Sequence, residues 1–202
     1  MHIVDGALST PVIVGGAVLC AAGIGVGLKT LEVEKVPAAG VLSAMFFVAS
    51  LVHVPLGPSS VHLIMNGLCG LVLGWAAFPA LFIALLLQAV FFGFGGLTTL
   101  GVNTVDIALP AVIVYYVCRA GVATAAPKAA AAWGALGGGL AIILTTGCVA
   151  AALALTGDQF LPAAKLVFLG HIPIMAIEAV LCGAAVLLIR RVKPELLNFL
   201  AK

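Results

Sequence analysis

The chain has 202 residues, of which 64% are hydrophobic and 8% are charged. A soluble domain carries roughly 25% charged residues, so this composition excludes a water-soluble globular protein and predicts that most of the perimeter faces the lipid bilayer. The formal net charge of +2 gives no reason to expect a nucleic-acid partner, and the five cysteines lie singly in apolar runs without a CxxC pair.

The first residues, MHIVDG, are unusual because no basic residue precedes the apolar run, as it would in a signal peptide. The amine of Met1, the backbone nitrogen of His2 and its imidazole Nδ1 can together bind one metal ion in two fused chelate rings. This requires a free amine and a deprotonated amide, which Ni(II) and Cu(II) achieve near neutral pH. One further imidazole would complete a square-planar set of four nitrogens, a geometry that these ions favour. The chain end is therefore a candidate ligand if it folds back into the protein.

Charged and turn residues divide the chain into apolar blocks that predict about seven transmembrane helices. The expected spans are 8–28, 36–54, 60–74, 76–92, 105–117, 129–155 and 161–189. The third to fifth are shorter than the roughly 20 residues that cross a bilayer unaided. Short helices are tolerated when they lie inside a bundle or line a cavity, which places these three at the centre. The expected fold is an all-α integral membrane protein with a single domain over residues 1–202.

Small residues recur four positions apart in the first span, a spacing that lets two helix backbones approach closely. The pairs are Ala17 with Ala21 and Gly23 with Gly27. They indicate either packing inside the bundle or a contact with a partner helix.

The distribution of basic residues predicts the orientation in the membrane. A cytoplasmic C-terminus places eight of the nine lysines and arginines inside, in agreement with the positive-inside rule. These eight are Lys29, Lys35, Arg119, Lys128, Arg190, Arg191, Lys193 and Lys202. Lys165 alone then lies outside, as does the N-terminus with His2.

The segment HVPLGPSSVHLIMNG, residues 53–67, carries the densest group of polar residues within the apolar blocks. Its Pro-Gly-Pro break ends one span, and Ser59 or Ser60 is expected to cap the next helix. His62 would then lie in the first turn, with Asn66 one turn below on the same face. His62 is either the fourth nitrogen ligand or a histidine bonded to a neighbouring carbonyl, whereas His53 is expected at the outer interface.

Further polar residues follow in the later spans. Gln88 lies in an apolar span and Asn103 follows the glycine-rich loop FFGFGGLTTLG, so their amides either orient a ligand imidazole or join two helices. Asp106 either adds charge near a bound cation or marks the outer interface. His171 and Glu178 share one face of the last helix, where a relay, a docking spot or pairing within the bundle are the alternatives.

MHIVDG, the break before His62 and QAVFFGFGGLTTLGVN (residues 88–103) resemble the NikM/CbiM family, and the resemblance continues through GHIPIMAIEAVL and RRVKPELL. Members are the substrate-capturing (S) membrane components of energy-coupling-factor (ECF) importers, a class of ABC transporters, for nickel and cobalt. The resemblance implies a compact seven-helix bundle whose N-terminus is inserted into an outward-facing metal site. Its implied ligands are Met1, His2 and His62.

The resemblance also implies a substrate, partner subunits and a cellular location. The substrate would be Ni(II), because GPSSVHLIMNG departs from the pattern of the cobalt branch; Co(II) for cobalamin synthesis is the alternative. The partners would be a transmembrane coupling (T) subunit and ATPase (A) subunits, and a small accessory membrane subunit is left open. The expected location is the bacterial or archaeal plasma membrane.

The sequence lacks features that two other classes of membrane protein require. A membrane metal-dependent hydrolase needs a general base beside the metal, but HExxH is absent and Glu178 is far from the N-terminus in sequence. An autonomous secondary carrier is expected to have paired internal repeats, and no convincing repeat is found. No nucleotide-binding motif occurs in the sequence. We therefore expect that partner subunits hydrolyse ATP and that this chain is not an enzyme.

Overall fold

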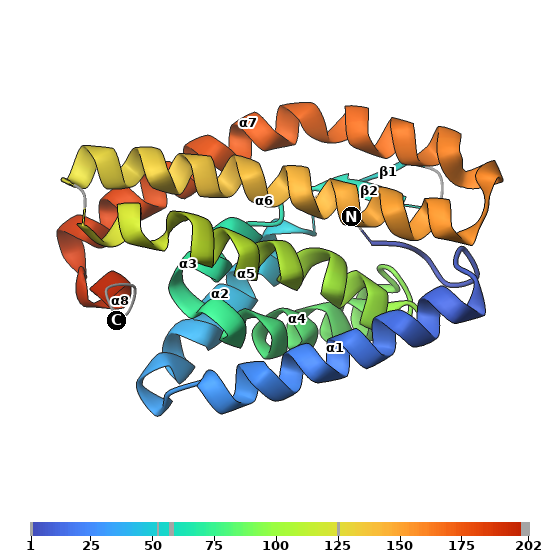
Figure 1. Cartoon of the computed structure of the whole chain (residues 1–202), viewed down its shortest axis with the longest axis horizontal. Coiled ribbons are helices and arrows are strands. Elements are labelled where there is room, and N and C mark those ends of the chain that lie inside the picture. Colours follow the sequence, from blue (N-terminus) through green and yellow to red (C-terminus); the bar gives the residue numbers. More distant parts are fainter. Residues whose placement is uncertain (1, 52, 57–58, 125, 199–202) are drawn as a thin grey trace.

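The computed structural model describes residues 2–51, 53–56, 59–124 and 126–198 of the chain (Figure 1). The main helices are α1 (Thr10–Thr30), α2 (Val36–Ala49), α3 (Asn66–Leu73), α4 (Ala77–Phe92), α5 (Leu100–Thr124), α6 (Pro127–Thr156) and α7 (Leu161–Val192), followed by the short α8 (Glu195–Asn198). Strands β1 (His53–Leu56) and β2 (Ser59–His62) lie between α2 and α3. Single 3-10 turns occur at Val33–Lys35, Gly74–Ala76 and Asp158–Phe160.

Helices α1 to α7 follow the seven expected spans in order. Among the described residues, five segments are long and apolar enough to cross a membrane, namely α1, Asn66–Phe92, α5, α6 and Asp158–Val192. Proline occupies one of the first two positions of α1, α2, α6 and α7, where its missing N–H costs no helical hydrogen bond. Helix α4 ends at Gly93, whose φ of 65° suits a glycine C-cap.

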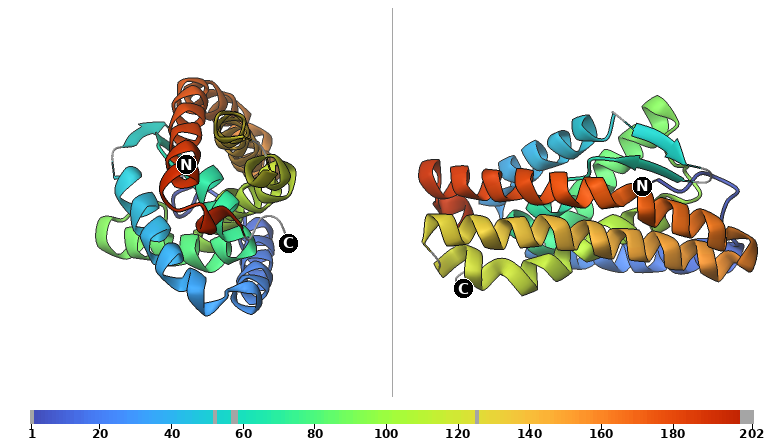
Figure 2. Two further views of the ribbon diagram at one scale, coloured as in Figure 1. Left: turned by 90° about the vertical axis from the view of Figure 1, so that its left-hand side faces the viewer. Right: turned by 90° about the horizontal axis from the view of Figure 1, so that it is seen from above.

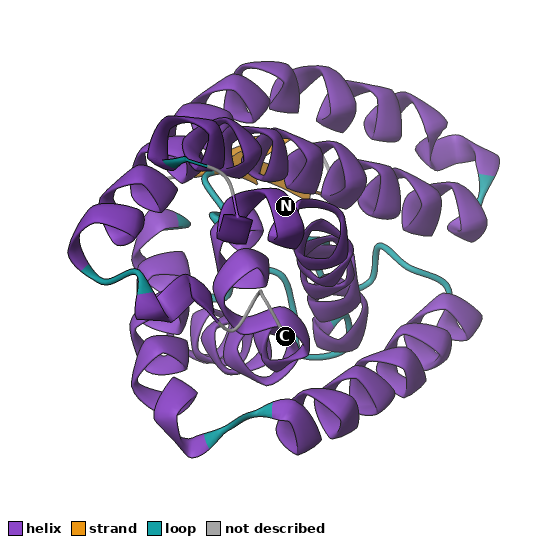
Figure 3. Ribbon diagram, turned by 60° about the vertical axis from the view of Figure 1, so that its left-hand side comes forward, coloured by secondary structure: helices purple, strands orange, loops and turns teal. Residues whose placement is uncertain are grey.

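The helices form a bundle around α3, in which every residue is buried. Helices α6 and α7 run side by side in opposite directions, α5 lies next to α6, and α1 runs along the opposite side of the bundle (Figures 1 and 2). Figure 3 shows the outer helices surrounding the shorter central ones. The expected central position is confirmed for the third span, whereas the fifth is a full-length helix, α5.

The third expected span differs from the structure in its first half. Residues 60–65 are not helical: the chain returns from α2 through an antiparallel hairpin that pairs His53 with His62 and Pro55 with Ser60. Helix α3 begins only at Asn66. Pro55 has no backbone N–H to donate in a helix, and Val54 and Val61, which pair across the hairpin, favour strands. Ser59 and Ser60 therefore cap no helix, and His62 and Asn66 do not share a helical face.

Seven of the eight lysines and arginines in the described part of the chain gather at one end of the bundle, and Lys165, near the beginning of α7, is the exception (Figure 1). The α1–α2 connection, the α5–α6 connection and the end of α7 lie together at this end (Figure 1), where Arg190 donates a hydrogen bond to the carbonyl of Ala123 at 3.1 Å. The opposite end holds the hairpin, the α4–α5 loop and the beginning of α1.

Candidate metal site

The N-terminal segment, residues 2–9, turns back from the start of α1 and enters the bundle (Figure 1). Its first two described residues are almost completely buried: His2 is 3% exposed and Ile3 is 0% exposed. Met1 lies outside the described residues, so its expected role as a ligand is untested. The position of His2 nevertheless agrees with the expectation that the chain end folds inward.

Asn103 on α5 binds the segment at Ile3. The Ile3 N–H donates to Asn103 Oδ1 at 2.8 Å, and Asn103 Nδ2 donates back to the Ile3 carbonyl at 3.0 Å. The hydroxyl of Thr99 donates to the same carbonyl at 2.8 Å. An amide side chain has one acceptor and one donor end, so Asn103 satisfies both backbone groups of Ile3 as a neighbouring strand would. This fixes how far the preceding residues reach into the bundle.

Asp5 anchors the same segment at the beginning of α5. Its Oδ1 accepts hydrogen bonds from the Thr98 hydroxyl and from the backbone N–H groups of Thr98 and Thr99, at 3.0 and 3.4 Å for the latter two. Free N–H groups at a helix start favour a carboxylate. The Thr98 hydroxyl bond, foremost, lowers the pKa of Asp5 below its usual value. Asp5 is therefore ionised near neutral pH and ties the segment to the α4–α5 loop.

The glycines of the α4–α5 loop make room for this segment. A Cβ at Gly96 would lie 1.9 Å from Asp5 Oδ1, and one at Gly95 would lie 3.2 Å from the His2 Cβ. Gly95 also has a φ of 74°, which favours glycine. The loop thus lies directly against the N-terminal segment.

Two imidazoles meet at the inner end of the segment. The rings of His2 and His62 stack with their centroids 4.6 Å apart and an interplanar angle of 21°, and Phe94 of the loop lies 6.3 Å from the His2 ring. The backbone N–H of His2 donates to Ser60 Oγ at 3.4 Å. The hairpin and the chain end, distant in sequence, are thereby brought together.

The tautomer of His62 follows from its contact with the backbone. Nδ1 lies 2.8 Å from the Leu63 carbonyl, which can only accept, so Nδ1 carries the proton and Nε2 keeps its lone pair. Burial lowers the pKa of His62 well below its usual value, which favours the neutral ring. A neutral imidazole with one free lone pair is the form that binds a metal. The carbonyl contact and a ligand role, posed as alternatives for His62, are therefore compatible.

The described residues bring no group of three or more histidine, cysteine or carboxylate side chains together for a metal ion. Any further donors to an ion between His2 and His62 would have to come from the backbone or from the chain terminus.

The other amides have structural partners. Asn66 donates to the Ile107 carbonyl and to Thr145 Oγ1, both at 2.9 Å. Gln88 donates to the Phe47 carbonyl at 3.2 Å and to Ser50 Oγ. These bonds join α3 to α5 and α6, and α4 to α2 and its C-cap residue. Of the three amides expected near the site, only Asn103 has a bond to the N-terminal segment.

Asp106 lies one turn after Asn103 on α5 and is 4% exposed. Its Oδ2 has no hydrogen-bond partner among the described residues. The side chain borders a groove of about 530 Å³ that also contacts Cys148 and Gly16. A role in adding charge near a cation stays a prediction.

His171 and Glu178 are both buried but do not pair with each other. Within the described residues, Glu178 Oε1 accepts from the N–H groups of Ile64 and Met65 at 2.5 and 2.8 Å. His171 Nδ1 contacts the Val167 carbonyl of its own helix at 2.6 Å. The expected pairing fails because the backbone before α3 supplies the donors that Glu178 needs.

The small residues of α1 divide into two sets. Gly23 and Gly27 are buried, and a Cβ on them would lie 2.4 Å from Phe78 and 2.5 Å from Pro79. They therefore pack inside the protein and are not available to a partner, which corrects half of the candidate interface. Ala17 and Ala21 are exposed on the outer surface.

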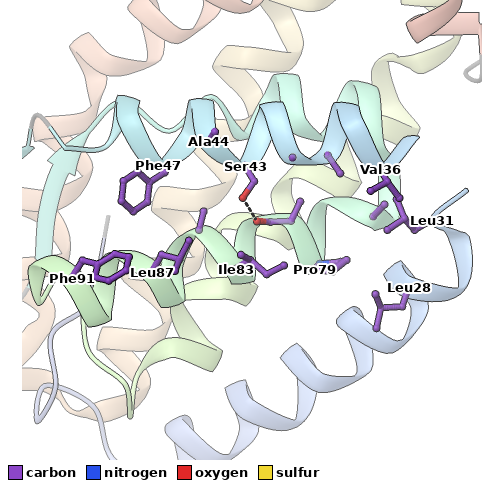
Figure 4. A pocket seen from close by; sticks show the side chains of 15 residues that line it. Leu28, Leu31, Val36, Ser43, Ala44, Phe47, Pro79, Ile83, Leu87 and Phe91 are labelled. Atoms are coloured by element: carbon purple, nitrogen blue, oxygen red, sulfur yellow. Dashed lines mark hydrogen bonds between the residues drawn. The ribbon is translucent and has the colours of Figure 1, made fainter. Parts of the chain in front are cut away.

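An apolar groove of about 630 Å³ lies between α2, α4 and the end of α1 (Figure 4). Its one polar side chain, Ser43, donates to the Ala80 carbonyl at 2.8 Å. It offers no metal ligand and is separate from the two stacked imidazoles.

Sequence reasoning missed Asp5, Thr98 and Thr99, and it missed the contacts of Ser60 and Glu178, two residues that it had singled out for other roles. Most act on backbone groups, which leave no mark in the sequence. The threonines at the end of a glycine-rich loop, just before a helix, are the one signal that could have indicated them.

Comparison with known proteins shows which proteins the chain is similar to. Residues 2–196 match the family described as "Cobalt uptake substrate-specific transmembrane region". A Haemophilus influenzae protein whose name assigns it to metal transport is 40% identical over 200 residues, which are 98% of this chain and 97% of the relative. The fused nickel transport protein NikMN of Rhodobacter capsulatus is 36% identical over 118 residues, which are 54% of this chain and 33% of that protein. The crystal structure of a truncated transition metal transporter superposes with a TM-score of 0.76 at 26% identity, covering 95% of this chain and 99% of that one.

Proposed function

Because the chain belongs to the NikM/CbiM family of membrane components for nickel and cobalt transport, we propose that it captures Ni(II) at the buried inner end of its N-terminal segment. As a family member it is a multi-pass membrane protein. The observation that carries the proposal is the stacking of His2 on His62 with ring centroids 4.6 Å apart.

The donor set contains four nitrogens. His62 contributes Nε2, which its bond to the Leu63 carbonyl leaves unprotonated. His2 contributes its ring and its backbone nitrogen, and Met1, outside the described residues, contributes the chain amine. The His2 N–H donates to Ser60, so coordination replaces that hydrogen bond and releases a proton. Ni(II) favours such a planar nitrogen set, and Co(II) is the alternative substrate.

Transport requires further subunits in this proposal. A coupling (T) subunit and ATPase (A) subunits of an ECF importer would drive release, with or without a small accessory membrane subunit. The gathering of basic residues at one end of the bundle supports a cytoplasmic position for that end and an outer position for His2. A membrane hydrolase finds no support, because the Glu178 carboxylate accepts bonds from the Ile64 and Met65 backbone.

The proposal is tested by extending the chain at either end. One alanine added before Met1 should abolish tight Ni(II) binding, because Asn103 holds Ile3 fixed and the added residue displaces the amine from the chelate. The same addition after Lys202 should leave binding unchanged. Binding is measured by Ni(II) titration and intact-protein mass spectrometry of the purified chain.

Magnetic measurements provide a second readout of the same site. Square-planar nickel should be diamagnetic, and its affinity should fall as the pH drops, since protons compete for the amine, the amide and the imidazoles. Paramagnetic six-coordinate nickel with oxygen ligands, or tight binding by the N-terminally extended chain, would contradict the proposed site.

A further inference from the structure

Glu178 is a buried carboxylate on α7 that the metal site itself does not use. It is 0% exposed, and Oε1 accepts the N–H groups of Ile64 and Met65. Oε2 has no hydrogen-bond partner among the described residues. Burying a carboxylate in an apolar bundle costs free energy, which indicates that the contact with Ile64 and Met65 has a role.

The residues that Glu178 binds form a connector, residues 63–65, between His62 and the first residue of α3. Met65 precedes α3 with a φ of 56° and makes no side-chain cap of its own. It is the one non-glycine residue with a positive φ in the described part of the chain. Such a conformation is unfavourable for methionine and persists when its surroundings hold it. Glu178 provides that hold from a different helix, by accepting two N–H groups at the start of α3.

Close packing keeps Glu178 at a fixed distance from the connector. A Cβ at Gly138 of α6 would lie 2.5 Å from the Glu178 carbonyl oxygen and 2.7 Å from the Cys182 Cβ. A Cβ at Gly67 of α3 would lie 2.9 Å from the Gly138 Cα. Helices α3, α6 and α7 therefore meet at their backbones here, and α7 has no room to move towards α3 if the side chain is shortened.

The connector in turn orients His62. Its first residue, Leu63, supplies the carbonyl that fixes the proton on His62 Nδ1 and leaves Nε2 unprotonated. A displacement of residues 63–65 would move this carbonyl and the ring with it.

We propose that Glu178 is the positioning residue for His62: by binding the connector it holds the imidazole in the place where it meets His2. This inference rests on the proposed function, in which His62 is a metal ligand. What matters is that the side chain is long enough for its oxygen to reach the connector from α7, and its negative charge is secondary.

Two conservative variants separate reach from charge. Glu178→Gln retains an acceptor oxygen at the same distance without the charge, and should bind Ni(II) as the native chain does. Glu178→Asp retains the charge but is shorter by one methylene, and should weaken binding roughly 10- to 100-fold, as is usual when an outer partner of a metal ligand is lost. Cys182→Ala is the matched control, since Cys182 packs against the same glycine of α6, whereas the N–H groups of Ile64 and Met65 donate to Glu178.

Cu(II) serves as a spectroscopic probe of the ligands. In Glu178→Asp, electron paramagnetic resonance of the bound Cu(II) should show one coordinating imidazole fewer, as in His62→Ala. The double variant Glu178→Asp/His62→Ala should bind no more weakly than His62→Ala alone, because Glu178 acts through His62. Thermal melting of each purified variant checks that the fold is retained.

The outcomes separate this inference from the proposed function. Native affinity of His62→Ala would overturn the proposed function and this inference together. Weak binding by His62→Ala with native binding by Glu178→Asp would overturn the inference alone. The inference is also overturned if Glu178→Gln binds as weakly as Glu178→Asp, or if the effects of Glu178→Asp and His62→Ala multiply.

Discussion

The side chain of Asn103 binds the backbone of Ile3 in the way that a neighbouring strand would. Its oxygen accepts the Ile3 N–H, and its nitrogen donates to the Ile3 carbonyl. A hydrogen bond to the backbone is indifferent to the side chain that the residue carries. Because Ile3 is held in place, the number of residues before it determines how far the segment reaches into the bundle.

The first prediction at the residue scale concerns this amide. Asn103→Ala removes both bonds to Ile3 and should weaken Ni(II) binding roughly 10- to 100-fold. Gln88→Ala removes an equally buried amide whose bonds join α4 to α2, and should leave the affinity close to native. Titration of both purified variants decides: equal affinities would show that Asn103 has only a general role in packing.

The second prediction concerns the histidines. His62→Ala should leave a three-nitrogen site completed by water, with weaker and less selective binding, and His2→Ala should be the most damaging variant. His53 is the hairpin partner of His62 by register, yet His53→Ala should have little effect. Competition between Ni(II) and Zn(II) measures the selectivity. Comparable losses for His53→Ala and His62→Ala would mean that the wrong histidine has been assigned.

The sequence identified His2, His62 and Asn103, and the structure brings them together. The sequence-based prediction wrongly placed Gln88 and Asn66 near the same site, because a sequence does not tell which neighbour a buried amide contacts. Glu178 was noticed as a polar residue in a span, but its partners are backbone N–H groups, which every residue except proline carries. Residue identity alone could not indicate them.

At the scale of elements, the hairpin between α2 and α3 is what hydropathy could not predict. Residues 60–74 are apolar enough for a span, but the first part of this block is a strand and a connector that carry His62 inward. The blocks for α1, α4, α6 and α7 were predicted well, because long apolar runs bounded by charges and prolines have one stable solution in a bilayer. The block for α2 was predicted to end at residue 54, but the helix ends at Ala49 and the hairpin follows.

The third prediction tests the contact between the α4–α5 loop and the N-terminal segment. Gly96→Ala places a methyl group 1.9 Å from the present position of Asp5 Oδ1, so either the loop or the segment must move. We expect weaker Ni(II) binding and faster Ni(II) release, measured by stopped-flow exchange with a chelator. Gly147→Ala on α6, where a Cβ would meet nothing within 4 Å, is the control. Unchanged release from Gly96→Ala would show that the loop does not hold the segment.

At the scale of the whole molecule, we propose that a partner subunit moves the site through the outer face of α1. Helix α1 follows directly after the N-terminal segment, and one face of it is exposed while Gly16, Gly23 and Gly27 pack inward. Force applied to its outer face by a partner would be transmitted to His2 through a segment of a few residues.

The fourth prediction follows from this arrangement. Replacing Ala17 and Ala21 with leucine should spare Ni(II) binding by the isolated chain, because both residues are exposed, but should block uptake by cells that express the partner subunits. Val18→Leu on the same helix is the control. Loss of binding by the isolated double variant would indicate internal packing, and normal uptake would exclude this face as the interface.

The separation in sequence between the chain end and its binding site has a consequence for biosynthesis. The bonds between Ile3 and Asn103 span 100 residues, and the bond between His2 and Ser60 spans 58. Ribosomes add about 5–20 residues per second, so the first residues translated wait on the order of 5–20 seconds before their partner on α5 exists. His2 and Ile3 are therefore translated well before α5, and their burial against it waits until this helix has entered the membrane.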